Sequence, residues 1–225
     1  MCPLPAASRR KNVGKFLSTP FSPDGHNENP YRPWPRHLHA WQALPRREFR
    51  EGIYNREIAR RVVSDLQDRG RDAQLLVPED DDISLQERVR RVNAQCLLHG
   101  KNHVILVSIH VNAAASDGKW HNATGWSVYT SKGKTAADDL ATCLANAAAK
   151  ALEGHRIRAD WSDGDIDFEE GFYVLRKTLC PAALTENLFM DNYQNRDYLI
   201  SQAGKKAITQ LHVEGICDYL DSIGK

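Results

Sequence analysis

One apolar run near the middle of the chain does most to limit its fold. Residues 104–109 read Val-Ile-Leu-Val-Ser-Ile, so five of these six side chains are aliphatic, and His110 follows directly. An uninterrupted run of this length and type is typical of a strand that is buried on both faces of a parallel sheet. We therefore predict a strand from Val104 to Asn112 within an α/β fold.

Helical and strand-like patterns alternate from residue 51 onward. Apolar side chains that recur every three or four residues predict helices over 51–69, 84–96, 135–152 and 208–219. Short apolar segments predict strands at 73–77, 104–112, 125–130, 172–175 and 182–186. This alternation predicts one α/β domain with a twisted, mostly parallel sheet of about six strands, flanked by helices.

The first 50 residues follow a different pattern. Six of the ten prolines of the chain lie between Pro20 and Pro45. We expect an irregular segment over 1–21 and a domain over 22–225. A loop rich in proline and aromatic residues is expected as an insertion in this domain at about 27–50, where it would cover a cleft.

Composition excludes several classes of function. A hydrophobic content of 41% and a net charge of +1 argue against nucleic-acid binding through bulk charge. No apolar run approaches the roughly 20 residues of a membrane span. The first ten residues lack the apolar centre of a signal peptide. The five cysteines are scattered without a CxxC pair, which indicates reduced thiols.

Two carboxyl-terminal strand ends carry ionisable residues. His110 follows its apolar run directly, and Glu186 follows the segment Pro-Ala-Ala-Leu-Thr. Open α/β sheets place their chemistry at this edge. Taken alone, His110 is more simply explained by one hydrogen bond at a strand end, and an ion pair is the alternative explanation of Glu186.

Glu51 and His26 complete a set of candidate ligands. Glu51 precedes Ile58 by seven residues, which places it on the apolar face of the first helix, where a carboxylate needs a partner or a cation. A favourable interaction with the helix dipole is the simpler explanation. His26 follows Gly25 in a turn-like segment, with His37 and His39 as rivals nearby.

These four residue types are the parts of a hydrolytic zinc site. In such a site two histidines and one carboxylate hold a catalytic zinc ion, and the fourth position stays open for water or substrate. A further glutamate serves as general base. The chain supplies them in the order His26, Glu51, His110 and Glu186. It contains no HExxH helix, which excludes the common zinc-peptidase motif.

Several segments together resemble one family. They are Gly25-His26, Glu51-Gly-Ile-Tyr-Asn-Arg-Glu-Ile-Ala59, Ile83-Ser-Leu-Gln-Glu-Arg-Val89 with Asn93, Ser108-Ile-His-Val-Asn112, Phe172-Tyr-Val-Leu-Arg176, Cys180-Pro-Ala-Ala-Leu-Thr-Glu-Asn-Leu-Phe-Met-Asp-Asn192 and Leu211–Leu220. Over roughly residues 22–222 the chain resembles the zinc-dependent N-acetylmuramoyl-L-alanine amidases of the amidase-3 type. One departure is that two prolines interrupt residues 16–23, where the family has an apolar strand.

The resemblance implies an enzyme with one Zn²⁺ per chain, held by His26, Glu51 and His110. Glu186 is then the general base. Asn112 and Arg176 are implied substrate-binding residues. The substrate is peptidoglycan, cleaved between N-acetylmuramic acid and L-alanine, by a chain expected to be a monomer that binds no nucleic acid. Such an enzyme acts on the cell wall, and either a phage or prophage lysin or a host enzyme whose leader was trimmed fits this role.

Two other functions stay open. One is a different zinc amidohydrolase or carboxypeptidase that acts on another peptide. The other is a cell-wall-binding protein that has lost its metal, which the interrupted segment at 16–23 keeps possible.

An acidic segment carries six carboxylates between Asp160 and Gly171. Because like charges prefer water, we expect a solvated loop. The functional alternative is a cleft wall that selects substrates with a free amine.

Overall fold

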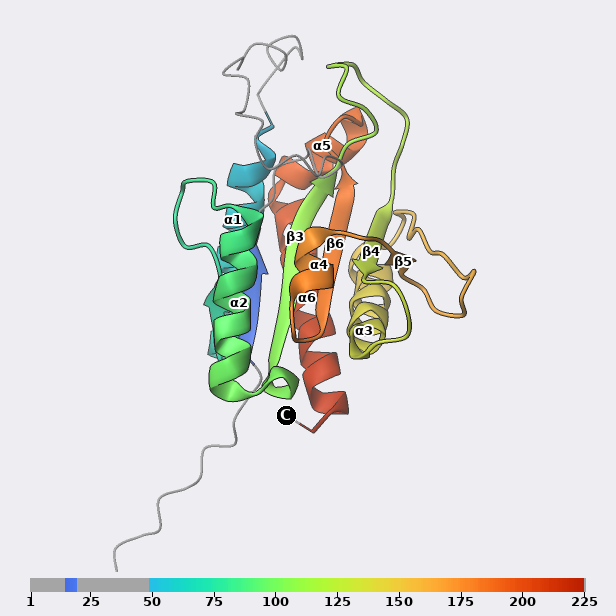
Figure 1. Ribbon diagram of the computed structural model, residues 1–225. Coiled ribbons are helices and arrows are strands. Elements are labelled where there is room, and N and C mark those ends of the chain that lie inside the picture. The colour runs from blue at the N-terminus through green and yellow to red at the C-terminus, as the bar shows by residue number, and fades with distance from the viewer. Residues whose placement is uncertain (1–14, 20–48, 225) are drawn as a thin grey trace, which may run out of the picture.

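A computed structural model of the chain describes residues 15–19 and 49–224, with helices on both sides of one sheet (Figure 1). The helices are α1 (Glu51–Asp68), α2 (Leu85–His99), the short 3-10 helix η2 (Lys101–His103), α3 (Ala136–Ala151), α4 (Tyr173–Lys177), α5 (Tyr193–Ile200) and α6 (Gln202–Ser222). The strands are β1 (Lys15–Thr19), β2 (Ala73–Leu75), β3 (Val104–Asn112), β4 (Trp126–Thr130), β5 (Phe168–Glu169) and β6 (Ala182–Phe189). No helix in this part of the chain has the length and apolar character that a membrane crossing requires.

The sheet has the strand order β2-β1-β3-β6-β4-β5. Neighbouring strands are parallel except for β4 and β6, which are antiparallel. Four strands of five or more residues form its body, and the shorter β2 and β5 form its edges. The predicted α/β class, with a mostly parallel sheet between helices, is confirmed.

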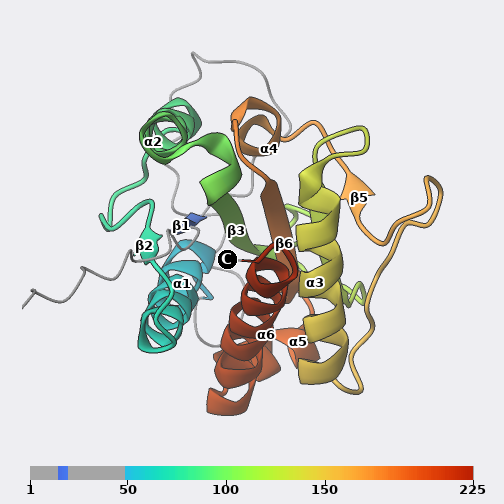
Figure 2. The same ribbon diagram turned by 90° about the horizontal axis from the view of Figure 1, so that it is seen from below.

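Helices α1, α3 and α6 cover one face of the sheet, and α2 and α4 cover the other (Figure 2). Side chains of β3 alternate between these two cores. Ile105, Val107 and Ile109 belong to the first core, whereas Val104 and Leu106 belong to the second. This burial on both faces is what the apolar run predicts.

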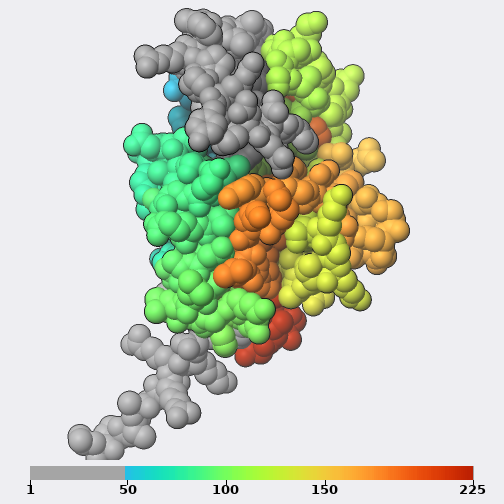
Figure 3. All heavy atoms as spheres, viewed as in Figure 1, coloured from blue at the N-terminus to red at the C-terminus, as the bar shows by residue number. Residues whose placement is uncertain are grey.

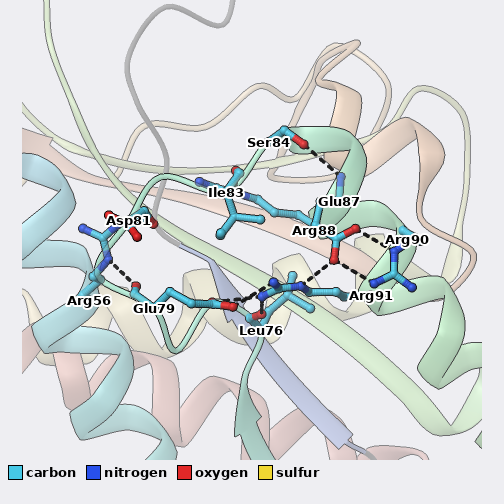
Figure 4. Close-up of polar contacts among 10 residues, drawn as sticks. All are labelled: Arg56, Leu76, Glu79, Asp81, Ile83, Ser84, Glu87, Arg88, Arg90 and Arg91. Atoms are coloured by element: carbon cyan, nitrogen blue, oxygen red, sulfur yellow. Dashed lines mark hydrogen bonds and ion pairs between the residues drawn. The ribbon is translucent and has the colours of Figure 1, made fainter.

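Arginine contacts hold the first turns of α2 and the segment before it, as Figure 4 shows. Ser84 Oγ caps α2 by accepting a hydrogen bond from Glu87 N at 3.3 Å. The Glu87 carboxylate pairs with Arg90 at 2.6 Å and Arg91 at 3.0 Å. Arg56 of α1 donates to Glu79 O at 3.1 Å and thereby ties α1 to this segment.

Residues 172–175, predicted as a strand, instead begin helix α4, which lies at the surface beside α2 (Figure 3). Val174 and Leu175 are buried in the core that α2 shares. A run of four apolar residues has no periodicity that separates a strand from one helical turn. The strand prediction for this segment was therefore wrong.

Residues 15–19, which the sequence places in an irregular segment, form the inner strand β1 between β2 and β3. The domain therefore begins before residue 22. In the sequence Pro20 follows the last residue of the strand, so the proline does not interrupt it. Helix α5 was also not predicted, and α6 begins at Gln202, six residues before the expected start at Ile208.

The acidic segment between Asp160 and Gly171 is partly buried. Asp167 is 1% exposed and accepts a hydrogen bond from Thr130 Oγ1 at 2.6 Å. Burial, together with the negative charge of Asp165, raises the pKa of Asp167 to about 6. Phe168 and Glu169 then form β5, so part of this segment belongs to the sheet.

Helices α3 and α6 approach so closely at Gly215 that a larger residue does not fit. A Cβ atom on Gly215 would lie 2.7 Å from Leu144 Cα and 3.1 Å from Cys143 O, which are backbone atoms. We expect Gly215→Ala to lower the free energy of unfolding by about 1–3 kcal/mol, the usual effect of overpacking. Urea unfolding measures this change. Gly171→Ala is the control, because nothing lies within 4 Å of that position, and equal stability of both variants would contradict the tight packing.

Candidate active site

Strands β3 and β6 place two ionisable side chains next to each other. In their parallel register His110 pairs with Glu186, and on the other side of β6 Ser127 pairs with Glu186. Paired residues point to the same face of a sheet. The three side chains therefore form a row across β3, β6 and β4, on the face that α2 and α4 partly cover.

A β-bulge follows this row directly. Asn112 pairs with Phe189, so β6 has one residue more than β3 beyond the pair of His110 and Glu186. Leu188 lies in the bulge with a φ of 64°, and its side chain is fully buried. A branched residue in this left-handed conformation carries strain of about 1–3 kcal/mol. Bulges re-aim side chains beside functional sites, and this one turns the chain immediately after Glu186.

Asn187 holds the bulge in place through buried hydrogen bonds. Its Nδ2 donates to His110 O at 2.8 Å and to Thr185 Oγ1 at 3.1 Å. Its Oδ1 accepts from Trp126 Nε1 at 2.9 Å. The amide thus gives His110 O a donor where the strand ladder is irregular.

His212 of α6 completes this network. Its Nδ1 lies 2.7 Å from Ile208 O, and because a carbonyl only accepts, we assign the proton to Nδ1. Nε2 then accepts from Thr185 Oγ1 at 2.8 Å. Burial lowers the pKa of His212 to about 4, so this histidine stays neutral and serves as a fixed hydrogen-bonding group.

Glu51 reaches the row from the first turn of α1. Its Oε1 accepts hydrogen bonds from Asn55 Nδ2 at 2.9 Å and from Val111 N at 3.3 Å. The same oxygen lies 3.4 Å from His110 Nδ1. Oε2 is buried and has no hydrogen-bond partner among the described residues. Glu51 is thus a buried carboxylate with one oxygen still unsatisfied.

His110 is 1% exposed and its ring is fixed from one side. Nε2 lies 2.8 Å from Ser108 Oγ, so Nδ1 is the ring nitrogen that faces Glu51. Burial lowers the pKa of His110, and the Glu51 carboxylate opposes this only in part. The imidazole is therefore neutral near pH 7, which is the form that binds metal ions.

Glu186 lies in surroundings that favour its protonated form. Burial, followed by the negative charge of Glu51, raises the pKa of Glu186 well above its usual range, and the charge of Arg158 opposes this. Oε2 of Glu186 is buried without a hydrogen-bond partner within residues 49–224. Perturbed carboxyl groups of this kind cluster at functional sites.

The remaining predicted site residues lie in different places. Asn112 lies two residues beyond His110, at the end of β3. Arg176 is exposed on α4 rather than at a strand end. His26 and its rivals, His37 and His39, lie outside the described residues. In residues 49–224, no three His, Cys, Asp or Glu side chains are grouped in a way that could hold a metal ion.

Sequence reasoning overlooked Asn187 and Arg158. An asparagine inside an apolar strand signals a buried hydrogen-bond network, and this signal could have identified Asn187. Arg158 gives no local signal, because the aromatic rings that hold it, Phe168 and Phe189, are distant in sequence.

A profile of the N-acetylmuramoyl-L-alanine amidase family Amidase_3 matches residues 40–218. The chain belongs to this family. The match includes Glu51, His110 and Glu186, and it begins after His26. The family resemblance read from the sequence is thereby confirmed. A search of curated proteins finds no significant match.

Solved structures of N-acetylmuramoyl-L-alanine amidases and of an endolysin catalytic domain share the fold of this chain. An N-acetylmuramoyl-L-alanine amidase from Clostridium difficile 630 is 24% identical over 95% of this chain and 100% of that one, with a TM-score of 0.67. The amidase Ami1 from Mycobacterium smegmatis is 17% identical over 94% and 100%, with the same TM-score. The catalytic domain of the CD27L endolysin, which targets Clostridia difficile, is 18% identical over 92% and 97%, with a TM-score of 0.58.

The Asn187 amide should be essential for the stability of this member of the family. Asn187→Ala leaves the buried Trp126 Nε1 and His110 O without a partner, so we expect a loss of about 2–4 kcal/mol in the free energy of unfolding. Chemical denaturation measures this loss. Asn146→Ala on the exposed face of α3 is the control, with a change below about 0.5 kcal/mol. A similar small change at both sites would show that the network adds no stability.

Proposed function

We propose that this chain is a zinc-dependent hydrolase that cleaves the amide bond between N-acetylmuramic acid and L-alanine in peptidoglycan. Membership of the family supports the reaction and the substrate class. The observation that carries the proposal is the approach of His110 Nδ1 and Glu51 Oε1 to 3.4 Å in a buried position. A neutral imidazole nitrogen and a carboxylate oxygen need a shared proton or a cation between them.

The described residues fit a zinc ion. Two ligand atoms that each lie ~2.0–2.2 Å from one tetrahedral ion are about 3.3–3.6 Å apart, and the distance between Nδ1 and Oε1 lies in this range. Ser108 holds the other ring nitrogen of His110, as an outer hydrogen-bond partner of a metal ligand does. His110 and Glu51 would therefore hold the zinc, with His26 as the proposed third ligand and His37 or His39 as its rivals.

Glu186 is the proposed general base and acid. A zinc ion held by His110 and Glu51 would polarise the scissile carbonyl and make a water molecule more acidic. A cation beside Glu186 would favour its ionised form, because a positive charge lowers the carboxyl pKa that burial and Glu51 raise. The carboxylate would take one proton from the water whose oxygen bonds to the carbonyl carbon, and would return it to the nitrogen of L-alanine as the amide bond breaks. Its register with His110, a proposed ligand, supports this role, as does its buried Oε2, which has no competing partner among the described residues.

Substrate contacts are assigned from position. Asn112 lies on the same strand two residues beyond His110, so its amide is proposed to bind the peptide beside the scissile bond. Arg176 is exposed on α4 and is retained as a proposed contact with a more distant part of the substrate. The substrate implies action in the cell wall.

Metal content and product analysis test the proposed function together. We expect about one zinc per purified chain, and loss of both metal and activity in a chelator, with recovery on adding zinc. Digestion of muropeptides should release stem peptides that begin with a free L-alanine amine, as mass spectrometry would detect.

Two results would contradict this function. Protein that is folded but contains no zinc and cannot be loaded would favour a metal-free cell-wall-binding protein. Cleavage within the stem peptide, with the muramyl amide intact, would favour a different zinc amidohydrolase or carboxypeptidase.

Two matched glutamine variants separate the proposed ligand from the proposed base. Glu186→Gln should keep zinc and fold but lose about 10²–10⁴-fold in kcat, the usual size of a general acid–base effect. Glu51→Gln should lower zinc occupancy, because a neutral amide is a poorer ligand than a carboxylate. Zinc analysis and turnover measure both effects. If Glu186→Gln loses the metal while Glu51→Gln retains it, the two roles are exchanged.

A further inference from the structure

Among the described residues, Arg158 lies next to the candidate active site without a salt-bridge partner. Arg158 follows α3 in the chain, and its backbone N donates to Trp126 O at 2.7 Å. This bond fixes Arg158 beside the start of β4, where the next residue, Ser127, pairs with Glu186. The charge of Arg158 acts on the Glu186 carboxyl, whose pKa it lowers against the larger effect of burial.

Aromatic contacts hold the guanidinium in a fixed place. Arg158 Cζ lies 5.6 Å from the ring centroid of Phe168 on β5 and 5.5 Å from that of Phe189 on β6. Arginine binds aromatic rings in this way through cation–π attraction. At Gly125 a Cβ atom would lie 2.9 Å from Arg158 Cγ, so the absence of a side chain there makes room for the arginine stem. Three separate segments therefore build the position of this side chain.

The guanidinium makes no hydrogen bond or ion pair within residues 49–224. Other arginines of the chain have carboxylate partners, as Arg69 does with Glu214 and Arg91 with Glu79. A half-buried cation with five unused N–H donors is unfavourable unless an anion joins it. The rings that hold Arg158 accept no strong hydrogen bond, so its donors stay available.

We propose that Arg158 binds a free carboxylate of the stem peptide, and thereby selects stems with this group over stems in which it is amidated. This inference rests on the proposed function. A planar guanidinium matches a carboxylate with two parallel hydrogen bonds, which a neutral amide cannot reproduce. In the proposed reaction Glu186 protonates the L-alanine nitrogen, so a residue beside Glu186 would be within reach of the peptide that follows this nitrogen.

A role through Glu186 is the main alternative and predicts different kinetics. If Arg158 acted only on the charge of Glu186, its loss would change kcat for every substrate alike. A residue that binds a substrate carboxylate changes KM, and it does so only for substrates that carry this group.

The test compares two muramyl peptides that differ only in whether the carboxyl groups of the second stem residue are free or amidated. The zinc-loaded full-length chain and its Arg158→Met variant are assayed with both. We expect Arg158→Met to raise KM about tenfold or more for the carboxylate peptide, the effect of losing a charge-assisted bidentate contact, and to change KM for the amidated peptide less than twofold. Arg156→Met is the matched control, because Arg156 is exposed and lies two residues away.

A second variant and a binding measurement keep the outcomes separate. Arg158→Lys keeps the charge but lacks the planar fork, so KM for the carboxylate peptide should rise to an intermediate value, with thermal unfolding confirming the fold of each variant. Equal losses with both peptides, or a change confined to kcat, would overturn the proposal. If the wild type cleaves neither peptide, the proposed function fails. Both peptides are then titrated into the Glu186→Gln protein and into the double variant that also carries Arg158→Met. The proposal requires tighter binding of the carboxylate peptide to the first protein and loss of this preference in the second.

Discussion

The parallel pairing of β3 with β6 is the constraint on which the arrangement at the carboxyl edge depends. It sets His110 against Glu186, and the bulge that follows prevents the two strands from continuing in that register. A shift of one residue would turn Glu186 to the opposite face, into the core of α1, α3 and α6. Asn187 already points to that face, where its amide donates to Thr185 Oγ1 and accepts from Trp126 Nε1, and Thr185 in turn bonds His212. One face thus carries the reactive groups, and the other carries the hydrogen bonds that fix the register.

Two buried carboxyl groups in one place need a compensating charge or proton. Glu51 is 7% exposed, and its negative charge raises the pKa of Glu186 further than burial alone. Within the described residues, hydrogen bonds from Asn55 and Val111 satisfy one oxygen of Glu51 and leave the other without a partner. Such an arrangement is unfavourable for an apoprotein and favourable around a divalent cation. The strained backbone of Leu188 is a second local cost that stability elsewhere must offset.

The sequence predicted those parts of the fold that depend on local periodicity. The stripe of Ile58, Val62 and Leu66 correctly identified α1, and the run from Val104 correctly identified β3. Its failures have two physical causes. The apolar residues of α4 were too few to show a period, and β1 owes its place to pairing with β2 and β3, which are distant in sequence. Long amphipathic elements carry their own signal, whereas short ones derive their structure from tertiary contacts.

The candidate site likewise has a part that the sequence predicted and a part that depends on tertiary contacts. His110 and Glu186 were identifiable because each follows an apolar run near the carboxyl end of its strand, and such ends meet at one edge of a parallel sheet. Their exact pairing depends on register and on a bulge at a leucine, and no local rule places a bulge at a leucine. Arg176 and Arg158 differ in the same respect. Arg176 lies within a recognisable family segment, whereas the position of Arg158 is created by rings from β5 and β6 and by the space at Gly125. A residue that is marked by its neighbours in the sequence can be predicted from that sequence. A residue such as Arg158, whose surroundings come from other segments of the chain, becomes recognisable only after those segments have been placed.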